Sequence, residues 1–168
     1  MYRVFLGLGS NIGDRLENLS RAVEEIRAIS SIRAISSIYE TEPVEMEDET
    51  LFLNMVIAIE TTSDAPLLLV QLKKIEKKVG RKLPSHGEPR IIDIDILLYR
   101  GLAYEDHSVC VPHPRLEHRR FALEPLCEIA PTALHPTLEK TVATLLRKCS
   151  DTHKVIRTEY HINYSIIN

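Results

Sequence analysis

Two aspartates stand one residue apart in the stretch Pro89–Tyr99, which reads P-R-I-I-D-I-D-I-L-L-Y. An extended strand has a period of two, so Asp93 and Asp95 fall on the same face, with Cα atoms roughly 6.5–7 Å apart. Mg²⁺ typically binds one or two carboxylates together with substrate phosphates. In two-metal sites the ions stand about 3.5–4 Å apart, a separation that two such acids can bridge. The spacing therefore predicts a site for hard cations.

The two faces of this predicted strand differ in polarity. With a period of two, one face holds Ile92, Ile94, Ile96 and Leu98, and the other holds Ile91, Asp93, Asp95, Leu97 and Tyr99. The aliphatic face is expected to lie on a core, whereas burial of the acidic face would be costly without a cationic partner. The alternative to a metal site is an edge strand whose acids face water.

A basic stretch follows at Val111–Phe121, V-P-H-P-R-L-E-H-R-R-F. Its basic side chains are His113, Arg115, His118, Arg119 and Arg120. This density is typical of an anion site, because guanidinium groups bind phosphate and carboxylate oxygens in pairs. A surface loop of solvated basic residues is the alternative.

A polar amide, Asn54, interrupts an otherwise apolar predicted strand at Phe52–Glu60. One interpretation is an amide that hydrogen-bonds neighbouring backbone. The other is an amide that binds the edge of a heterocycle, with Phe52 beside it as a stacking face. The residues alone leave both interpretations open.

The glycine-rich stretch Gly7–Gly13 follows a predicted buried strand, Tyr2–Leu8. Its spacing is G-x-G-x-x-x-G, and no acid ends the next strand about 20 residues on, as a dinucleotide-binding turn requires. We therefore interpret these glycines as a tight strand-to-helix turn.

The remaining elements follow from periodicity and capping signals. Asp14 and Asp64 each precede an apolar stripe of helical period, and Gly80 is expected to end the second helix. Further predictions are a strand at Ile32–Glu40, an acidic loop at Thr41–Thr50, a lid loop at Arg81–Pro89, a hairpin from Arg100–Gly101 to Val109–Val111, and short helices at Phe121–Ile129 and Leu138–Lys148. The tail 150–168 has a weak pattern that allows one last strand, and its role is uncertain.

The predicted element order is β-α-β-β-α-β with helical additions. This order favours a ferredoxin-like α+β sandwich, in which a mostly antiparallel sheet carries helices on one face, with extra C-terminal helices. The 168 residues are 44% hydrophobic and show no repeat or linker, so we expect a single domain over 1–168.

Composition narrows the class of protein further. The net charge of −3 gives no global basic field, so a nucleic-acid partner is not expected. No apolar run approaches the roughly 20 residues of a membrane helix. The three cysteines have no C-x-x-C spacing, which argues against a disulfide framework and a zinc site. We expect a soluble, cytoplasmic protein that acts on small molecules as a monomer or weak dimer.

Taken together, the motifs resemble a known family. They are L-G-S-N-I-G-D-R, Y-E-T-x-P, F-L-N-M, P-R-x-x-D-I-D-I-L-L, V-P-H-P and R-R-F-A-L-x-P-L-x-E-I-A-P, collinear from Val4 to about Leu146. They resemble 6-hydroxymethyl-7,8-dihydropterin pyrophosphokinase. The resemblance implies a ferredoxin-like fold and transfer of diphosphate from ATP to the hydroxymethyl group of the pterin, with release of AMP, in folate biosynthesis.

The resemblance also implies roles for individual residues. Asp93 and Asp95 would bind two Mg²⁺ ions that bridge the phosphates of the co-substrate ATP. The pterin would be bound by Thr41, Val44, Phe52, Asn54 and Phe121, with the two phenylalanines on its two faces. ATP would be bound by Lys73, Glu76, Arg81, Arg90, His113 and Arg119. The catalytic residues would be Arg81, Arg90, Asp93 and Asp95.

Two hypotheses from other classes remain open at this point. The first is a ferredoxin-like sensing module that binds a nucleotide or pterin without chemistry. It is motivated by the lid Arg81–Pro89, which is about one residue shorter than in the best-known members of the family, because lid closure completes the site in enzymes of this kind. The second is an interaction domain with an acidic surface strand.

Overall fold

The computed structural model describes residues 1–44, 50–81 and 88–163. The first half contains β1 (Tyr2–Ser10), α1 (Arg15–Arg27), β2 (Ser31–Ile35), β3 (Tyr39–Thr41), β4 (Phe52–Thr61), α2 (Ala65–Val79) and β5 (Asp93–Tyr99). The second half contains β6 (Tyr104–Glu105), β7 (Cys110–Val111), the 3₁₀ helix η1 (Leu116–His118), α3 (Arg120–Ile129), β8 (Leu134–His135), β9 (Lys140–Thr141), α4 (Val142–Lys148) and β10 (Val155–Arg157).

One antiparallel sheet organises the fold. Its strand order is β10-β3-β4-β1-β5, and β2 also pairs with β4. The first elements, in the order β-α-β-β-β-α-β, place β1 and β4 in the centre, with β5 at one edge. This arrangement confirms the predicted ferredoxin-like α+β fold.

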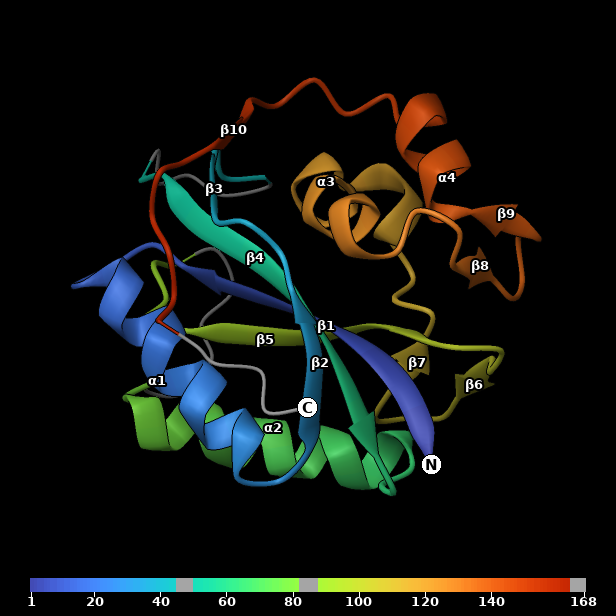
Figure 1. Ribbon diagram of the computed structural model, residues 1–168, viewed down its shortest axis with the longest axis horizontal. Helices are drawn as coiled ribbons and strands as arrows, with labels where there is room; N and C mark the ends of the chain where they lie inside the picture. The colour runs from blue at the N-terminus through green and yellow to red at the C-terminus, as the bar shows by residue number, and fades with distance from the viewer. Residues whose placement is uncertain (45–49, 82–87, 164–168) are drawn as a thin grey trace.

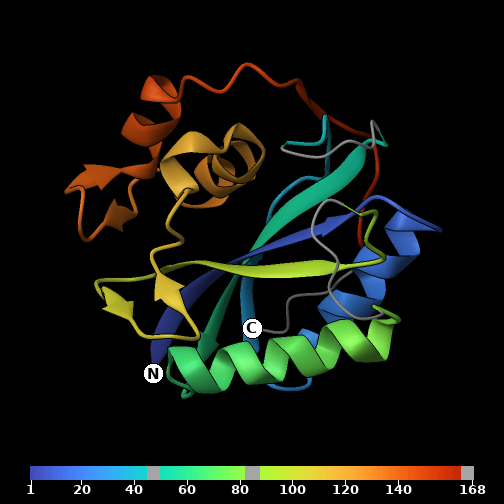
Figure 2. The same cartoon turned by 180° about the vertical axis from the view of Figure 1, so that it is seen from behind.

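Helices cover both faces of the sheet (Figure 1). On one face, α1 and α2 form a core with the strands through residues such as Leu19 and Leu72. On the other face, α3 and α4 form a second core through residues such as Leu123 and Leu145. Figure 2 shows the edge strand β5 between α2 on one side and α3 on the other. The C-terminal helices therefore cover the face that the predicted order of elements left open.

The predicted helix caps are confirmed. The Asp14 carboxylate accepts a hydrogen bond from the Glu17 N–H at 3.0 Å, and Asp64 accepts one from the Leu67 N–H at 3.0 Å. Each cap satisfies one of the N–H groups that a helix start leaves without a partner. Gly80 ends α2 with a φ of 126°.

The predicted faces of Leu98 and Tyr99 in β5 were wrong: Leu98 was expected on the aliphatic face and Tyr99 on the face of the two acids. The pairing of β1 with β5 shifts register between Phe5 and Leu6, where β5 carries one extra residue. A bulge of this kind reverses the alternation of side chains beyond it. Leu98 therefore packs in the α3–α4 core with Leu97, and Tyr99 packs in the α1–α2 core.

Other boundaries also differ from the predictions. The predicted strand Ile32–Glu40 is divided into β2 and β3, because Ser36 hydrogen-bonds Val56 through its N–H and its hydroxyl. The predicted helix Leu138–Lys148 begins only at Val142, after the β8–β9 hairpin, where the Thr141 hydroxyl accepts from the Thr144 N–H.

Several predicted segments lie wholly or partly outside the described residues. These are the acidic loop Thr41–Thr50, the lid Arg81–Pro89 and the end of the tail 150–168. The described part of the tail adds β10 to the sheet beside β3. None of the helices within 1–44, 50–81 and 88–163 has the length and apolar character that a membrane crossing requires.

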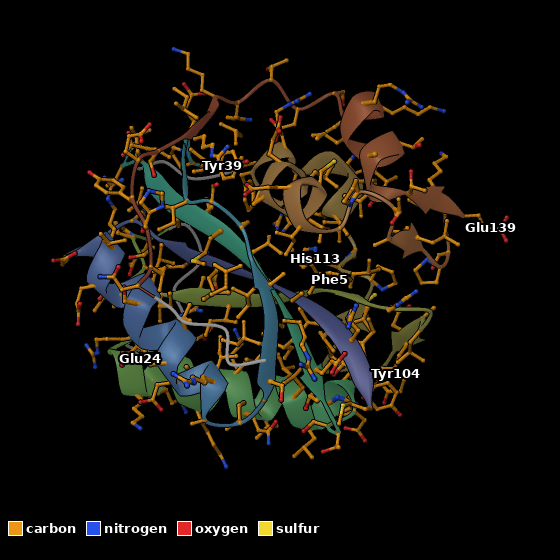
Figure 3. All side chains as sticks on the ribbon, in the orientation of Figure 1. Phe5, Glu24, Tyr39, Tyr104, His113 and Glu139 are labelled. Carbon is orange, nitrogen blue, oxygen red and sulfur yellow. The ribbon has the colours of Figure 1, made fainter. Side chains whose placement is uncertain are left out.

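Glu128 fastens α3 to the β2–β3 junction. Its carboxylate accepts from the Ser37 N–H and hydroxyl, both at 2.9 Å, and from the Tyr39 hydroxyl at 2.8 Å. Burial and this bond raise the pKa of Tyr39 to about 12. In Figure 3, Tyr39 lies beside α3, whereas Glu24 lies on the outer side of α1. The acid of the E-I-A-P motif thus links two layers of the fold.

Glu128→Ala removes three hydrogen bonds at this junction. We expect the free energy of unfolding to fall by about 1–3 kcal/mol, because the donors of Ser37 and Tyr39 lose a charged partner. Urea denaturation measures the change, with Glu24→Ala on exposed α1 as the control. Equal stability of the two variants would contradict this account.

Candidate active site

A cavity of about 410 Å³ lies on the α3 side of the sheet. It is lined by Gly7, Leu8, Gly9, Thr41, Glu42, Val44, Phe52, Asn54, Met55, Val56, Lys73, Arg81, Arg90, Asp93, Asp95, Leu97, His113, Arg115, Arg119, Phe121 and Ala122. All of the predicted site residues except Glu76 are in this set. The structure therefore brings together side chains from β3, β4, α2, β5 and the start of α3.

The sheet register sets the order of these side chains. Gly9 of β1 pairs with Asn54 of β4 on one side and with Asp93 of β5 on the other. Gly7 lies in the same way between Val56 and Asp95. Two glycines thus separate the amide of β4 from the acids of β5.

Gly9 is required by a close contact. A Cβ atom at this position would stand 2.4 Å from Asn54 Oδ1, a distance that real Cβ atoms essentially never show. At Gly7 the corresponding contact is 3.3 Å to methyl groups of Leu97. The interpretation of these glycines as a turn was therefore wrong for Gly7 and Gly9, which lie inside β1. Only Gly13, with a φ of 70°, serves the turn.

Asn54 has a defined partner. Its Nδ2 donates to the Thr41 hydroxyl at 2.7 Å, and both side chains are buried. Its Oδ1 lies over Gly9. This bond goes to a side chain, so it does not support the interpretation of Asn54 as an amide bonded to neighbouring backbone. Thr41 instead holds the amide at the cavity wall, with Phe52 beside it.

Asp93 is paired with two arginines. Its Oδ1 is 2.5 Å from Arg81 Nη1, and its Oδ2 is 2.6 Å from Arg90 Nη1. Burial opposes ionisation of this carboxyl group, but the positive charges of Arg81, Arg90 and Lys73 outweigh it and lower the pKa. Asp93 is therefore a carboxylate at neutral pH.

Asp95 is in a different environment on the same face. Its Oδ2 is 3.9 Å from Arg119 Nη1, and its side chain is 36% exposed, against 18% for Asp93. Burial and the adjacent charge of Asp93 raise the pKa of Asp95 to about 6, although Lys73 and Arg119 act in the opposite direction. Of the two acids, Asp95 is more open to the cavity.

His113 lies between the sheet and α3 (Figure 3). Its Nδ1 accepts from the Arg115 N–H at 3.2 Å, and its Nε2 is 3.4 Å from Arg119 Nη1. Burial and the charges of Arg119 and Arg115 lower the pKa of His113 to about 4. The imidazole is therefore neutral at pH 7.

Glu76 lies behind the cavity wall. Its side chain is 3% exposed, and its Oε1 accepts from the Ile94 N–H at 2.7 Å and from Lys73 Nζ at 2.8 Å. Its Oε2 is 2.9 Å from Arg81 Nη1. Glu76 thus connects α2 to the backbone between the two acids and holds two of the cationic side chains that line the cavity.

Some lining residues were not predicted. Gly7 and Gly9 were assigned to the turn, and Glu42, Met55, Leu97 and Ala122 carry no signal in their residue type. Arg115 belongs to the basic stretch that the sequence does mark. Within the described parts of the chain, no group of three or more His, Cys, Asp or Glu side chains is placed to hold a metal ion. A bound cation would therefore depend on the two carboxylates and on donors from a substrate.

Comparison with known proteins settles the family. Residues 5–131 match the family model described as 7,8-dihydro-6-hydroxymethylpterin-pyrophosphokinase (HPPK). This chain belongs to the HPPK family. The chain is 43% identical over 140 residues to the 2-amino-4-hydroxy-6-hydroxymethyldihydropteridine pyrophosphokinase of Aquifex aeolicus, which covers 83% of this chain and 88% of that protein. It is 42% identical over 127 residues to the protein of the same name from Bacillus subtilis, covering 74% and 76%.

Longer proteins contain a related part. The chain is 36% identical over 138 residues to folic acid synthesis protein FOL1 of Dictyostelium discoideum, covering 82% of this chain but only 21% of that protein. The wild-type HPPK-DHPS of Plasmodium falciparum, solved with pteroate, matches with a TM-score of 0.71 at 16% identity, covering 88% of this chain and 44% of that one. At this identity the structural match supports the fold alone.

The HPPK family and the names of these relatives confirm the resemblance found in the motifs. They also confirm the function that it implies, pyrophosphokinase activity in folate biosynthesis. The individual roles of the cavity residues remain predictions.

Gly9→Ala tests the contact beneath Asn54. The added Cβ displaces the Asn54 amide from Thr41, so we expect a loss of about 1–3 kcal/mol in the free energy of unfolding and reduced turnover. Gly7→Ala is the matched control, because the methyl groups of Leu97 can move aside. Urea denaturation compares the two variants. A larger loss for Gly7→Ala would contradict the assignment.

Proposed function

We propose that ATP phosphates bind over Asp93 and Asp95 while the pterin binds against Asn54, Phe52 and Phe121, so that diphosphate passes from one to the other across β1. The observation that carries this proposal is the register Asn54–Gly9–Asp93. Neighbouring strands are about 4.7–4.9 Å apart, so the backbones of β4 and β5 stand roughly 10 Å apart across β1. Two substrates bound over these strands lie side by side.

The β4 side of the cavity suits a flat, polar heterocycle. The Asn54 amide offers hydrogen-bonding groups for a ring edge, held in place by Thr41. Phe52 and Phe121 both line the cavity, and the Arg119 guanidinium lies 5.6 Å from the centre of the Phe121 ring. Aromatic side chains stack on such rings with a gain beyond simple burial. Val44 completes the set of residues proposed for the pterin.

The β5 side suits a triphosphate. Lys73, Arg81, Arg90, His113 and Arg119 all line this part of the cavity or its margin. Arginine binds phosphate with two parallel hydrogen bonds, and lysine binds it as a point charge. Glu76 supports this group indirectly, because it holds Arg81 and Lys73 from behind.

The two carboxylates also fit Mg²⁺. They provide hard oxygen donors on one face, and Asp95 is partly exposed to the cavity. Mg²⁺ usually binds through one or two carboxylates and completes its coordination with waters and substrate phosphates. Asp93 and Asp95 would therefore hold the two ions that the resemblance implies. When bound, such ions neutralise charge that develops on the phosphate oxygens.

In this reaction the protein forms no covalent bond to either substrate. The hydroxymethyl oxygen of the pterin loses its proton to solvent and forms a bond to the β-phosphorus of ATP, while the bond from that phosphorus to the α-phosphate oxygen breaks and AMP leaves with the electron pair of that bond. Asn54 and the phenylalanines would orient the pterin hydroxyl, while Arg81 and Arg90 would orient the phosphates. Positioning and charge stabilisation account for most of the rate in phosphoryl transfer.

The products test the proposal. Purified protein with ATP, Mg²⁺ and 6-hydroxymethyl-7,8-dihydropterin should form AMP and pterin diphosphate in equal amounts, resolved by anion-exchange chromatography. Formation of ADP would contradict diphosphate transfer. Binding of both substrates without product would favour the sensing module instead.

Asp95→Ala tests the role of the acids. We expect turnover to fall by about 10³-fold or more, because loss of a metal ligand removes several kcal/mol of transition-state stabilisation. The fold should survive, since the substitution relieves repulsion with Asp93. Steady-state kinetics and a urea melt measure the two effects, and Glu105→Ala on exposed β6 is the control. Wild-type turnover in Asp95→Ala would remove the metal assignment.

A further inference from the structure

The chain segment Cys149–Thr158, here called the strap, joins two walls of the cavity. It lies beyond residues 5–131, which the family model matches. The strap leaves α4, passes α3 and reaches the outer edge of the sheet as β10 beside β3 (Figure 1). One set of its hydrogen bonds goes to the start of α3, and another goes to β3 and its flanks.

The first anchor of the strap is Asp151. Helix α3 begins after Arg119, whose side chain forms no capping hydrogen bond. Instead the Asp151 carboxylate accepts from the Arg120 N–H at 2.9 Å, and the Asp151 carbonyl accepts from Arg120 Nε at 3.0 Å. The Asp151 side chain is only 6% exposed. An acid at this position satisfies an N–H group of the first turn and interacts favourably with the helix dipole.

The same carboxylate also orders the strap. Asp151 Oδ1 accepts from the His153 N–H at 3.0 Å and is 2.6 Å from His153 Nδ1. Asp151 therefore holds the start of α3 with one oxygen and the turn of the strap with the other.

The second anchor is at β3. Lys154 N–H donates to Glu42 Oε2 at 2.9 Å, and the Glu42 N–H donates to the Lys154 carbonyl at 3.1 Å. Val155 then pairs with Thr41 in the sheet, and the Thr158 N–H and hydroxyl both donate to the Ile38 carbonyl at 2.9 Å.

The two anchors limit how far apart the α3 wall and the β3 wall of the cavity can stand. Three residues of extended chain, from Asp151 to Lys154, span at most about 10–11 Å. On either side of this link, Phe121 follows Arg120 on the α3 wall, and Thr41 and Glu42 form the β3 wall. The acids Asp93 and Asp95 stand on β5, which β4 and β1 separate from β3.

We infer that the strap is a positioning element for the pterin, with Asp151 as the positioning residue that sets Phe121 opposite Thr41. This inference rests on the proposed function, because it takes Phe121 and Thr41 as walls of the pterin site. Walls held at a fixed separation bind a flat ring without first having to be ordered, which favours affinity. The strap is expected to act on the pterin more strongly than on ATP.

Asp151→Ala tests the inference by calorimetry with the pterin and, separately, with a non-hydrolysable ATP analogue and Mg²⁺. We expect the dissociation constant for the pterin to rise about tenfold, and that for the ATP analogue to change much less. Asp151→Asn keeps an acceptor oxygen and should restore most of the pterin affinity. Glu159→Ala, an exposed acid of the same region, is the matched control.

The possible outcomes distinguish failure of the positioning role of the strap from failure of the proposed pterin site. Pterin affinity in Asp151→Ala equal to that of Glu159→Ala, or an equal loss for both ligands, overturns the positioning role. If Asp151→Ala does not fold, Thr158→Ala tests the other anchor by the same comparison of the two ligands. Failure of the unaltered protein to bind the pterin even with the ATP analogue and Mg²⁺ present overturns the proposed function, and the inference with it.

Discussion

The ion pairs of Asp93 with Arg81 and Arg90 are the interaction on which the site depends. A carboxylate that is mostly removed from water is costly unless cations and hydrogen bonds compensate it. Here two guanidinium groups do so directly, and Glu76 fixes one of them from behind while accepting from the Ile94 N–H. The acids and the cations therefore keep one another in place, and several positive charges are gathered on one side of the cavity.

A second constraint comes from the backbone of β1. Side chains at positions 7 and 9 would fill the space between β4 and β5, and at Gly9 a Cβ would collide with Asn54. With glycine at both positions, the amide of one neighbouring strand and the acids of the other share a single cavity. The sheet register thus determines which two chemical groups are adjacent.

The sequence was sufficient for much of the fold. The apolar strand at Phe52–Glu60, the helix caps at Asp14 and Asp64 and most of the order of elements follow from local rules, and the structure confirms them. The family motifs also pointed to a set of side chains, and in the structure all of them except Glu76 line one cavity. Local rules failed at β5, where the extra residue beside Phe5 sends Leu98 and Tyr99 to the opposite cores. A bulge depends on the partner strand and leaves no mark in the period of its own strand.

The other failures have the same physical origin. Asp151 is 31 residues from Arg120 in the chain, and Glu128 is 91 residues from Ser37, so neither contact can be inferred from neighbours in sequence. Gly7 and Gly9 resemble turn residues in the sequence, and only the pairing of β1 with β4 and β5 shows that they lie inside a strand. Each of these residues makes its contact with an element distant in the chain.

The most direct test of the account is a crystal structure with Mn²⁺ in place of Mg²⁺, a non-hydrolysable ATP analogue and the pterin, in which anomalous scattering locates the metal. The account predicts metal within coordinating distance of both Asp93 and Asp95, bridged to the nucleotide phosphates, with the pterin between Phe52 and Phe121. Metal and nucleotide bound elsewhere, with the two acids still paired only to arginine, would contradict it.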